Sequence, residues 1–302
     1  MRVLMLTRRV DRVDPRAGFA HRWIEALARH PRVEQLDVIC LEMGEHDLPD
    51  NVSVASMGKE RGYGRLRELL EFRRALRPVI GRVDVVFGHM IPRYVLVAAP
   101  WAKRAGVPIV LWYTHRQVHA ELRLAHALAA RVVTASPESF TLPSRKLTVI
   151  GHGIDMSSFA PAERPAEGAG RLILAVGRLS PIKNYEVLIE AVALLAERPG
   201  FEDVRLAIAG GTTPEAPDYD ARLRALAERL EVAARVDLLG AVPPDEVPAL
   251  YRRAAVTANL SPTGGLDKVV IESLASGVPV VVHNRTFLPV LGEDAALLWA
   301  ER

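Results

Sequence analysis

The chain has 302 residues, of which 49% are hydrophobic and 25% are charged, and its net charge is +3. This composition is typical of a globular protein with room for two domains of about 150 residues, and it excludes a disordered or fibrous chain. The single cysteine, Cys40, excludes an intrachain disulfide and a cysteine zinc cluster, and we expect it to be a buried structural thiol in a reducing compartment.

The first residues, MRVLMLTRR, predict a β-strand, because the apolar run is short and no small-residue cleavage site follows it. No apolar run approaches the roughly 18 residues that a membrane span needs. We therefore expect a cytoplasmic protein.

Charge is distributed unevenly between the two halves. Residues 1–150 carry 24 lysines and arginines against 15 acidic residues, whereas residues 151–302 carry 15 against 21. The basic first half favours an anionic partner, such as a lipid phosphate, an acidic glycan or a membrane surface on which the protein lies peripherally. The alternative is that the Arg-rich helix faces are only solvated. Nucleic acid is not expected, because few aromatic residues accompany the cations and no reader motif is present.

Short apolar strands alternate with helical stretches along the whole chain. In the first half we expect strands at 2–7, 36–42, 83–89, 108–115 and 131–136, and helices at 17–30, 65–77, 95–106 and 119–130. After a stretch rich in Pro, Ala, Gly and Glu, strands are expected at 171–177, 204–211, 235–240, 255–261 and 279–284, and helices at 185–197, 221–232, 247–254 and 268–277.

This β/α alternation predicts an α/β protein with two mostly parallel sheets, each covered by helices on both faces. Two Rossmann-like domains are expected, at residues 1–150 and 171–302, with an interdomain linker at 151–170. Since ligands of such sheets bind beyond the carboxyl ends of the strands, domains that face each other would bind substrates in the cleft between them.

The stretch GRLSPIKNYEVLIEA, residues 177–191, places Arg178 and Lys183 where an apolar strand turns into an amphipathic helix. Free backbone N–H groups and the positive end of the helix dipole, together with two cations, form a suitable cradle for a pyrophosphate. Solvated cations are a weaker explanation, because cations at a helix N-terminus are unfavourable without an anion.

About 80 residues later, SPTGGLDKVVIESLASGVPVVV forms a Gly-rich turn that leads into a helix carrying Glu272. Together, the two segments resemble the nucleotide-sugar half of the retaining glycosyltransferases of family four, the glycosyl transferases group 1. The resemblance implies the GT-B fold, in which the first domain binds the acceptor and the second the nucleotide sugar. Family members generally continue beyond LLWAER, so the second domain is expected to be shortened at its C-terminus.

The resemblance also assigns roles to residues of the second half. It implies that Arg178 and Lys183 are catalytic, because they contact the donor diphosphate and offset the charge of the leaving group. Glu272 matches the second Glu of the family's E-x7-E motif, which holds the ribose, whereas Gly264 stands where the first Glu is expected.

Between these two positions, backbone amides at Gly264, Gly265 and Leu266 are expected to approach the phosphate or the donor sugar. Asp267 is a candidate to reach the sugar in place of the first Glu, and Lys268 is a candidate to add a phosphate cation. Gly210, with Gly211, marks a turn after a strand and is expected to approach the nucleotide. Gly277 is expected to end the helix for structural reasons.

Further matches lie nearer the N-terminus. His115, at the end of the strand at 108–115, corresponds to a family His near the anomeric centre and is a third catalytic candidate, while His89 is a weaker match. Gly18 corresponds to a loop glycine that lies against the donor or the acceptor; it is equally compatible with a plain loop. The segment VIGHGIDMSSFAP resembles the interdomain motif, with His152 in place of the usual Asn, and a hinge role is implied.

Other classes lack their motifs. There is no G-x-G-x-x-G after a strand, no P-loop and no G-x-S-x-G elbow. The only D-x-D, at Asp218 and Asp220, precedes a charged helix where carboxylates are expected anyway. We expect no metal and no cofactor.

The resemblance thus implies a retaining, hexosyltransferase-type enzyme that moves a sugar from a UDP- or GDP-linked donor to a glycan or a lipid-linked acceptor, as in polysaccharide biosynthesis. One alternative, suggested by Gly264, is a catalytically inactive nucleotide-sugar binding or scaffolding protein of the same fold. Another is a nucleotide-sugar epimerase, which would need further carboxylates in the cleft.

Overall fold

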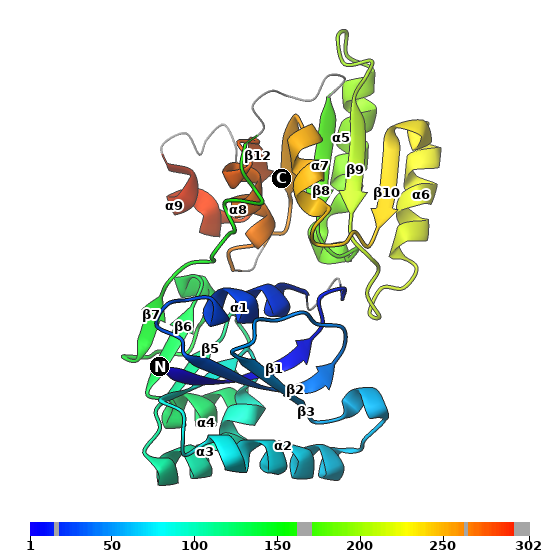
Figure 1. Ribbon diagram of the computed structural model, residues 1–302. Coiled ribbons are helices and arrows are strands. Elements are labelled where there is room, and N and C mark those ends of the chain that lie inside the picture. The colour runs from blue at the N-terminus through cyan, green and yellow to red at the C-terminus, as the bar shows by residue number, and fades with distance from the viewer. Residues whose placement is uncertain (15–17, 162–170, 263–264, 293–302) are drawn as a thin grey trace. The chain divides into compact units, whose positions relative to one another are not determined.

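The computed structural model describes residues 1–14, 18–161, 171–262 and 265–292. The chain divides into two compact units, Met1–Gly151 and His152–Arg302, which are coloured blue to green and green to red in Figure 1. Each unit is described by itself below.

The first unit is built on a seven-stranded parallel sheet with the order β3-β2-β1-β4-β5-β6-β7. Its strands are β1 (Arg2–Val10), β2 (Gln35–Met43), β3 (Val52–Ser56), β4 (Val85–His89), β5 (Ile109–Trp112), β6 (Arg131–Thr134) and β7 (Leu147–Val149). Residues 3–7 of the central strand β1 are all buried, because helices cover both faces of a parallel sheet.

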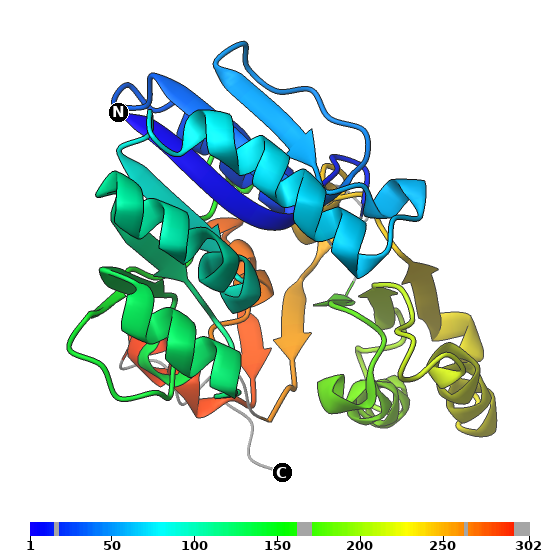
Figure 2. The ribbon, with the colours of Figure 1, turned by 90° about the horizontal axis from the view of Figure 1, so that it is seen from below.

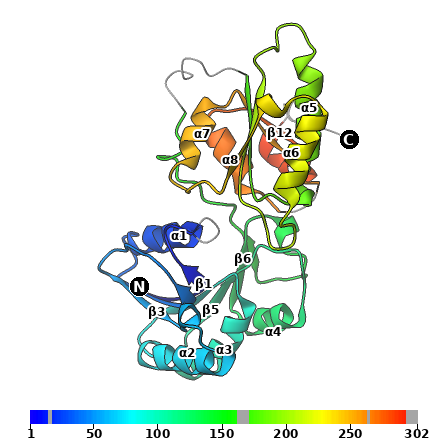
Figure 3. The same cartoon turned by 90° about the vertical axis from the view of Figure 1, so that its right-hand side faces the viewer.

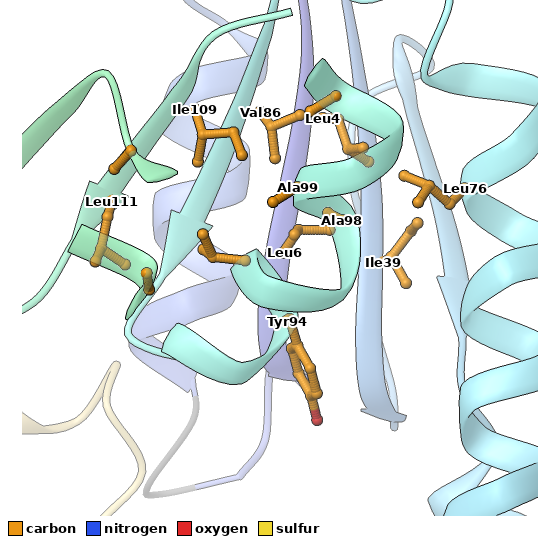
Figure 4. Packing of buried hydrophobic residues seen from close by; sticks show 14 of the residues in the cluster. Leu4, Leu6, Ile39, Leu76, Val86, Tyr94, Ala98, Ala99, Ile109 and Leu111 are labelled. Atoms are coloured by element: carbon orange, nitrogen blue, oxygen red, sulfur yellow. The ribbon is translucent and has the colours of Figure 1, made fainter. Parts of the chain in front are cut away.

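The helices of this unit are α1 (Gly18–Ala28), α2 (Arg65–Val79), α3 (Pro92–Ala105) and α4 (Ala120–Leu128). Helix α1 packs on one face of the sheet, and α2, α3 and α4 cover the other, as Figure 1 shows. In Figure 4, Ala98 and Ala99 of α3 lie over Leu4 and Leu6 of β1. Small buried residues at this contact let the helix backbone approach the sheet closely.

The second unit has a five-stranded parallel sheet with the order β10-β9-β8-β11-β12. Its strands are β8 (Leu172–Val176), β9 (Arg205–Ala209), β10 (Val236–Gly240), β11 (Val256–Asn259) and β12 (Val280–Val282). Its helices are α5 (Tyr185–Ala196), α6 (Tyr219–Arg229), α7 (Val247–Arg253), α8 (Lys268–Ala275) and α9 (Leu288–Leu291). Helices α5 and α6 cover one face of the sheet and α7 and α8 the other (Figure 3).

The predicted β/α alternation and the two Rossmann-like units are confirmed. The structure adds two strands, β3 and β7, that the sequence pattern did not predict. Both are short edge strands and only partly buried, so their apolar signal is weak.

Residues 152–161, which were expected to lie in a linker, pack on the second unit. Phe159 is buried and its ring meets that of Tyr251 at 5.8 Å. Asp155 accepts hydrogen bonds from the hydroxyls of Ser157 and Ser158, both at 2.6 Å. These bonds lower the pKa of Asp155 to about 2.

Two smaller expectations can also be compared with the structure. Cys40 is fully buried on β2, as expected, and burial raises the pKa of its thiol to about 12. Every helix in the described part of the chain is too short or too polar to span a bilayer.

Candidate functional site

Each sheet has one place where the order of its strands reverses. In the first unit this switch point lies between β1 and β4, and in the second between β8 and β11. The loops that follow two such strands leave toward opposite faces of the sheet, and ligands of open α/β sheets bind in the crevice that results. Most of the predicted site residues follow one of these four strands.

The turn after β8 carries the two predicted cations. Gly177 has a φ of 154°, and its carbonyl accepts a hydrogen bond of 2.8 Å from the hydroxyl of Tyr185, the first residue of α5. Tyr185 is buried, and burial raises the pKa of its hydroxyl. A buried side chain thus fixes the turn on which Arg178 and Lys183 stand.

Lys183 is joined to the second predicted segment. Its Nζ atom lies 2.7 Å from Oδ2 of Asp267, which is 84 positions further along the chain. The same oxygen accepts a hydrogen bond of 2.9 Å from Nδ2 of Asn259, the buried last residue of β11. The structure therefore brings together the turn after β8, the end of β11 and the start of α8. We call Arg178, Lys183, Asn259 and Asp267 the candidate phosphate cradle.

Asn259 was not among the residues predicted from the sequence. The signal was a polar residue near the end of the predicted strand 255–261, similar to the signal that drew attention to His115. Asn184, next to Lys183, donates a hydrogen bond of 2.8 Å to the carbonyl of Leu260. Side chains from both segments thus join the loop after β8 to the loop after β11.

The cradle has a net positive charge. Arg178 is exposed, and no carboxylate in the described ranges lies within 4.0 Å of it, whereas the charge of Lys183 is offset by Asp267. Lys268 begins α8 and adds a third cation to this edge of the sheet. This edge therefore attracts anions. The positive charge of Arg178 is the least neutralised by neighbouring carboxylates.

Glu272 is half-buried on α8, and its Oε2 atom lies 3.2 Å from the hydroxyl of Tyr251 on α7. That hydroxyl also lies 3.0 Å from the carbonyl oxygen of Val269. Burial and the neighbouring carboxylate raise the pKa of Tyr251 well above its ordinary value, so the hydroxyl stays a donor. Tyr251 thus orients Glu272. Its role was not predictable from the sequence, because an aromatic residue on an amphipathic helix usually indicates core packing.

His152, expected to act only in the hinge, lies against the predicted donor loop. It interacts with the backbone of Leu266, and burial lowers the pKa of its imidazole to about 4, with a smaller contribution from the charge of Lys268. The imidazole is therefore neutral at physiological pH and supports the loop that carries Asp267.

The predicted glycines differ in what surrounds them. A Cβ atom at Gly210 would lie 1.8 Å from the carbonyl oxygen of Gly177, so the ends of β8 and β9 meet only because this residue is glycine. Gly277 has a φ of 72° just beyond α8, the left-handed conformation expected of a helix-ending glycine. The carbonyl of Gly265 lies 3.5 Å from Nδ2 of Asn284, and Gly264 lies outside the described residues.

In the first unit, an aromatic cluster surrounds the switch point. Oγ1 of Thr7 on β1 lies 3.0 Å from Nδ1 of the buried His89 at the end of β4. The ring of Trp23, on α1, lies 5.3 Å from that of His89 and 4.9 Å from that of Trp112. Phe19 is half-exposed and meets His89 edge-on at 5.8 Å. Of the two candidate histidines, His89 is therefore the one that lies at the end of a strand bordering this switch point.

Two further candidates of the first unit are His115 and Gly18. His115 is exposed beyond β5, where its ring meets the edge of Tyr113 at 5.7 Å. Gly18 is buried as the first residue of α1 and donates its N–H to the carbonyl of Asp14 at 2.8 Å.

Comparison with known families gives one match, in the unit that carries the cradle. Residues 158–296 match the family described as glycosyl transferases group 1. Two similar relatives are the D-inositol 3-phosphate glycosyltransferases of Corynebacterium glutamicum and Nocardia farcinica. The first is 34% identical over 48% of this chain and 37% of its own length, and the second 31% over 64% and 44%. The chain thus matches less than half the length of these relatives.

Among solved structures, Anabaena HepE in complex with UDP matches 94% of this chain and 80% of its own, with a TM-score of 0.73 and 22% identity. Sucrose-phosphate synthase from Thermosynechococcus elongatus matches 94% and 81%, with a TM-score of 0.69 and 19% identity. These likenesses identify the fold of the chain as that of the GT-B glycosyltransferases.

Proposed function

Because residues 158–296 match the family described as glycosyl transferases group 1, we propose that the chain is a retaining glycosyltransferase of this family with a UDP- or GDP-sugar donor. The observation that carries this proposal is the candidate phosphate cradle. Two segments 84 positions apart meet at the switch point of the second sheet, where the exposed Arg178 and the paired Lys183 form a site for a diphosphate.

In the proposed reaction, the bond between the anomeric carbon and the diphosphate oxygen breaks, and a bond from that carbon to the acceptor oxygen forms. Arg178 and Lys183 stabilise the negative charge that develops on the leaving diphosphate. The departing phosphate oxygen takes the proton of the acceptor hydroxyl on the same face of the sugar, so the configuration is retained. Glu272, oriented by Tyr251, accepts hydrogen bonds from the ribose hydroxyls.

The similar structures favour UDP as the nucleotide, since HepE has been crystallised with UDP and with UDP-glucose. The acceptor is proposed to be a hydroxyl of a glycan or of a lipid-linked sugar. The proposed reaction needs no cofactor, because the nucleotide sugar is itself a substrate.

Calorimetric titration with UDP and with GDP tests the cradle. We expect one nucleotide to bind with micromolar affinity and the Arg178→Ala/Lys183→Ala variant to lose that binding. The matched control is Arg171→Ala/Arg205→Ala, which removes two exposed cations from the other end of the same sheet, where they pair with Asp203 and Asp237. If neither nucleotide binds the folded protein, or if the control loses binding equally, the proposed site is wrong.

Turnover is tested separately with radiolabelled UDP-sugars and a panel of hydroxyl acceptors. Loss of either cradle cation is expected to slow transfer by roughly 100-fold or more. Donor binding without release of nucleoside diphosphate would instead indicate the inactive binding protein that Gly264 suggests.

A further inference from the structure

Helix α2 exposes leucines on its outer face. Leu66 is 83% exposed, Leu70 57% and Leu69 39%, while Phe72 and Leu76, further along the helix, are buried in the core. The spacing i, i+3, i+4 places the three leucines on one side of the helix. Three neighbouring exposed leucines are unusual on a surface helix, whose outer face is normally polar.

Cations continue the same stripe toward the C-terminus of α2. Arg73 and Arg77 follow Leu66 at i+7 and i+11, and both are exposed. Their guanidinium groups lie 5.7 Å and 5.3 Å from the ring centre of Trp101 on the neighbouring helix α3. Trp101 thus joins α2 and α3 into one surface and holds two positive charges on it.

Helices α3 and α4 extend this surface. Figure 2 looks onto α2, α3 and α4, which run side by side in cyan to green, and α3 and α4 contact each other directly. On α4, Leu124 and Leu128 are 58% and 50% exposed, beside the exposed Arg123. The last turn of α3 carries Lys103 and Arg104, both exposed. We call the outer side of these three helices the α2–α4 face.

Positive charge on this face exceeds negative charge. Two of its carboxylates already have partners, since Glu71 pairs with Arg74 at 3.2 Å and Glu121 with Arg93 at 2.6 Å. Five other cations of this face have no acidic side chain of the described ranges within 4.0 Å: Arg73, Arg77, Lys103, Arg104 and Arg123.

We propose that the α2–α4 face binds the surface of a bilayer that contains anionic lipid. Leucines enter the boundary between headgroups and acyl chains, and the arginines and lysines around them contact lipid phosphates. Charge complementarity selects an anionic surface, and the exposed leucines select a partner with an apolar interior. A soluble polyanion would use the cations and leave the leucines in water. This inference is independent of the proposed glycosyl transfer.

Co-sedimentation with phosphatidylcholine vesicles, with and without phosphatidylglycerol, tests the inference. We expect the protein to bind only the vesicles that contain phosphatidylglycerol and to be released as the salt concentration rises. Arg73→Ala/Arg77→Ala should weaken binding about 30-fold, since each cation near an anionic surface contributes about fivefold. Leu66→Ser/Leu70→Ser should weaken it about 100-fold, from about tenfold for each leucine.

Matched controls come from the second unit. Leu194 on α5 is 66% exposed, so Leu194→Ser removes an exposed leucine from elsewhere in the protein, and Arg171→Ala/Arg205→Ala removes two exposed cations. Both control variants should bind vesicles like the wild type. Vesicles should also shift the fluorescence of Trp101 to shorter wavelength, and the Trp101→Phe variant should lose that shift. Nucleotide binding is measured on every variant, so a failure of this inference is distinguishable from a failure of the proposed function.

Three results would overturn the proposal. One is that the protein does not bind vesicles containing phosphatidylglycerol. Another is that the Leu66→Ser/Leu70→Ser variant, shown by circular dichroism to be folded, binds these vesicles like the wild type. Charge alone would then account for binding, and a soluble polyanion such as nucleic acid would be the better partner. The third is self-association that Leu66→Ser alone abolishes, which would assign the face to a second copy of the chain.

Discussion

Asp267 limits the positive charge that Lys183 offers to a ligand. Its Oδ2 atom lies 2.7 Å from Nζ of Lys183 and accepts a second hydrogen bond from Asn259. A diphosphate that binds Lys183 must therefore approach a carboxylate that is already there. We predict that Asp267→Asn strengthens the binding of the nucleoside diphosphate, because an amide oxygen keeps an acceptor at this place without its charge.

The magnitude follows from the distances. A phosphate oxygen in hydrogen-bond contact with Nζ, at about 2.8 Å, would lie roughly 5 Å from Oδ2 of Asp267. Two unit negative charges at that separation repel by about 0.8 kcal/mol in water and about 3 kcal/mol at an effective dielectric constant near 20. The Asp267 side chain is 37% exposed, so the lower part of this range applies. A repulsion of about 1 kcal/mol corresponds to about a fivefold change in Kd.

Titration calorimetry with UDP or GDP, at low and at physiological salt, measures this effect. Kd should fall about fivefold in Asp267→Asn at low salt and less at higher salt, because screening weakens the repulsion. Asp203→Asn is the control, since it removes an exposed carboxylate from the other end of the same sheet, where it pairs with Arg171. Its Kd should change by less than about twofold.

Weaker nucleotide binding in Asp267→Asn would refute this reasoning and show that Asp267 positions Lys183 for the ligand. A third outcome is also distinguishable. If Asp267 contacts the donor sugar, as the sequence predicts, the substitution should weaken the binding of the nucleotide sugar while the binding of the free nucleotide is strengthened.

Three predictions concern stability. Gly210→Ala should destabilise the second unit by about 3 kcal/mol, because its Cβ would lie 1.8 Å from a carbonyl oxygen. Gly153→Ala is the control and should not destabilise the unit, because no atom lies within 4 Å of its Cβ. Urea unfolding measures both variants. The ammonium of Lys146 donates hydrogen bonds to the carbonyls of His126, Ala127 and Ala129 at the end of α4. Lys146→Met should therefore lower the free energy of unfolding of the first unit by about 1 to 2 kcal/mol and its Tm by several degrees. An unchanged Tm would contradict this prediction. The pKa of His152 is about 4 in the folded protein and about 6.5 in the unfolded chain, so the free energy of unfolding is highest above about pH 6.5 and falls as the pH is lowered toward 4. At pH 5 the free energy of unfolding should be lower by about 1 to 2 kcal/mol, a value discounted for partial exposure of the ring. His152→Asn should remove this part of the pH dependence, as measured by urea unfolding.

Much of the second unit was predictable because its signals are local. An apolar strand, a turn with Arg178 and Lys183 and an amphipathic helix follow each other between Leu172 and Ala196, and each pattern depends only on near neighbours. The same holds for the β/α alternation, and hence for the fold class. The edge strands β3 and β7 escaped prediction because exposed edges carry a weak apolar pattern.

The partners of the candidate residues were not predictable. Sequence indicated that Lys183, Asp267 and Glu272 matter, but not that Asp267 neutralises Lys183 or that Tyr251 orients Glu272. Sequence placed His152 in a hinge segment, but only the structure shows that it lies against the backbone of Leu266. Each of these contacts joins residues from different elements, so it depends on strand order rather than on spacing.

The sequence by itself therefore determined which residues share a strand, a turn or a helix face, because the periods of 2 and 3.6 residues are properties of the local backbone. Only the tertiary structure decided which of those faces are covered and which side chains meet. Leu66 and Leu76 illustrate the difference, since both are leucines of one amphipathic helix, yet one is 83% exposed and the other fully buried. The physical reason is that burial and pairing arise from packing between distant segments, which the order of strands in the two sheets sets.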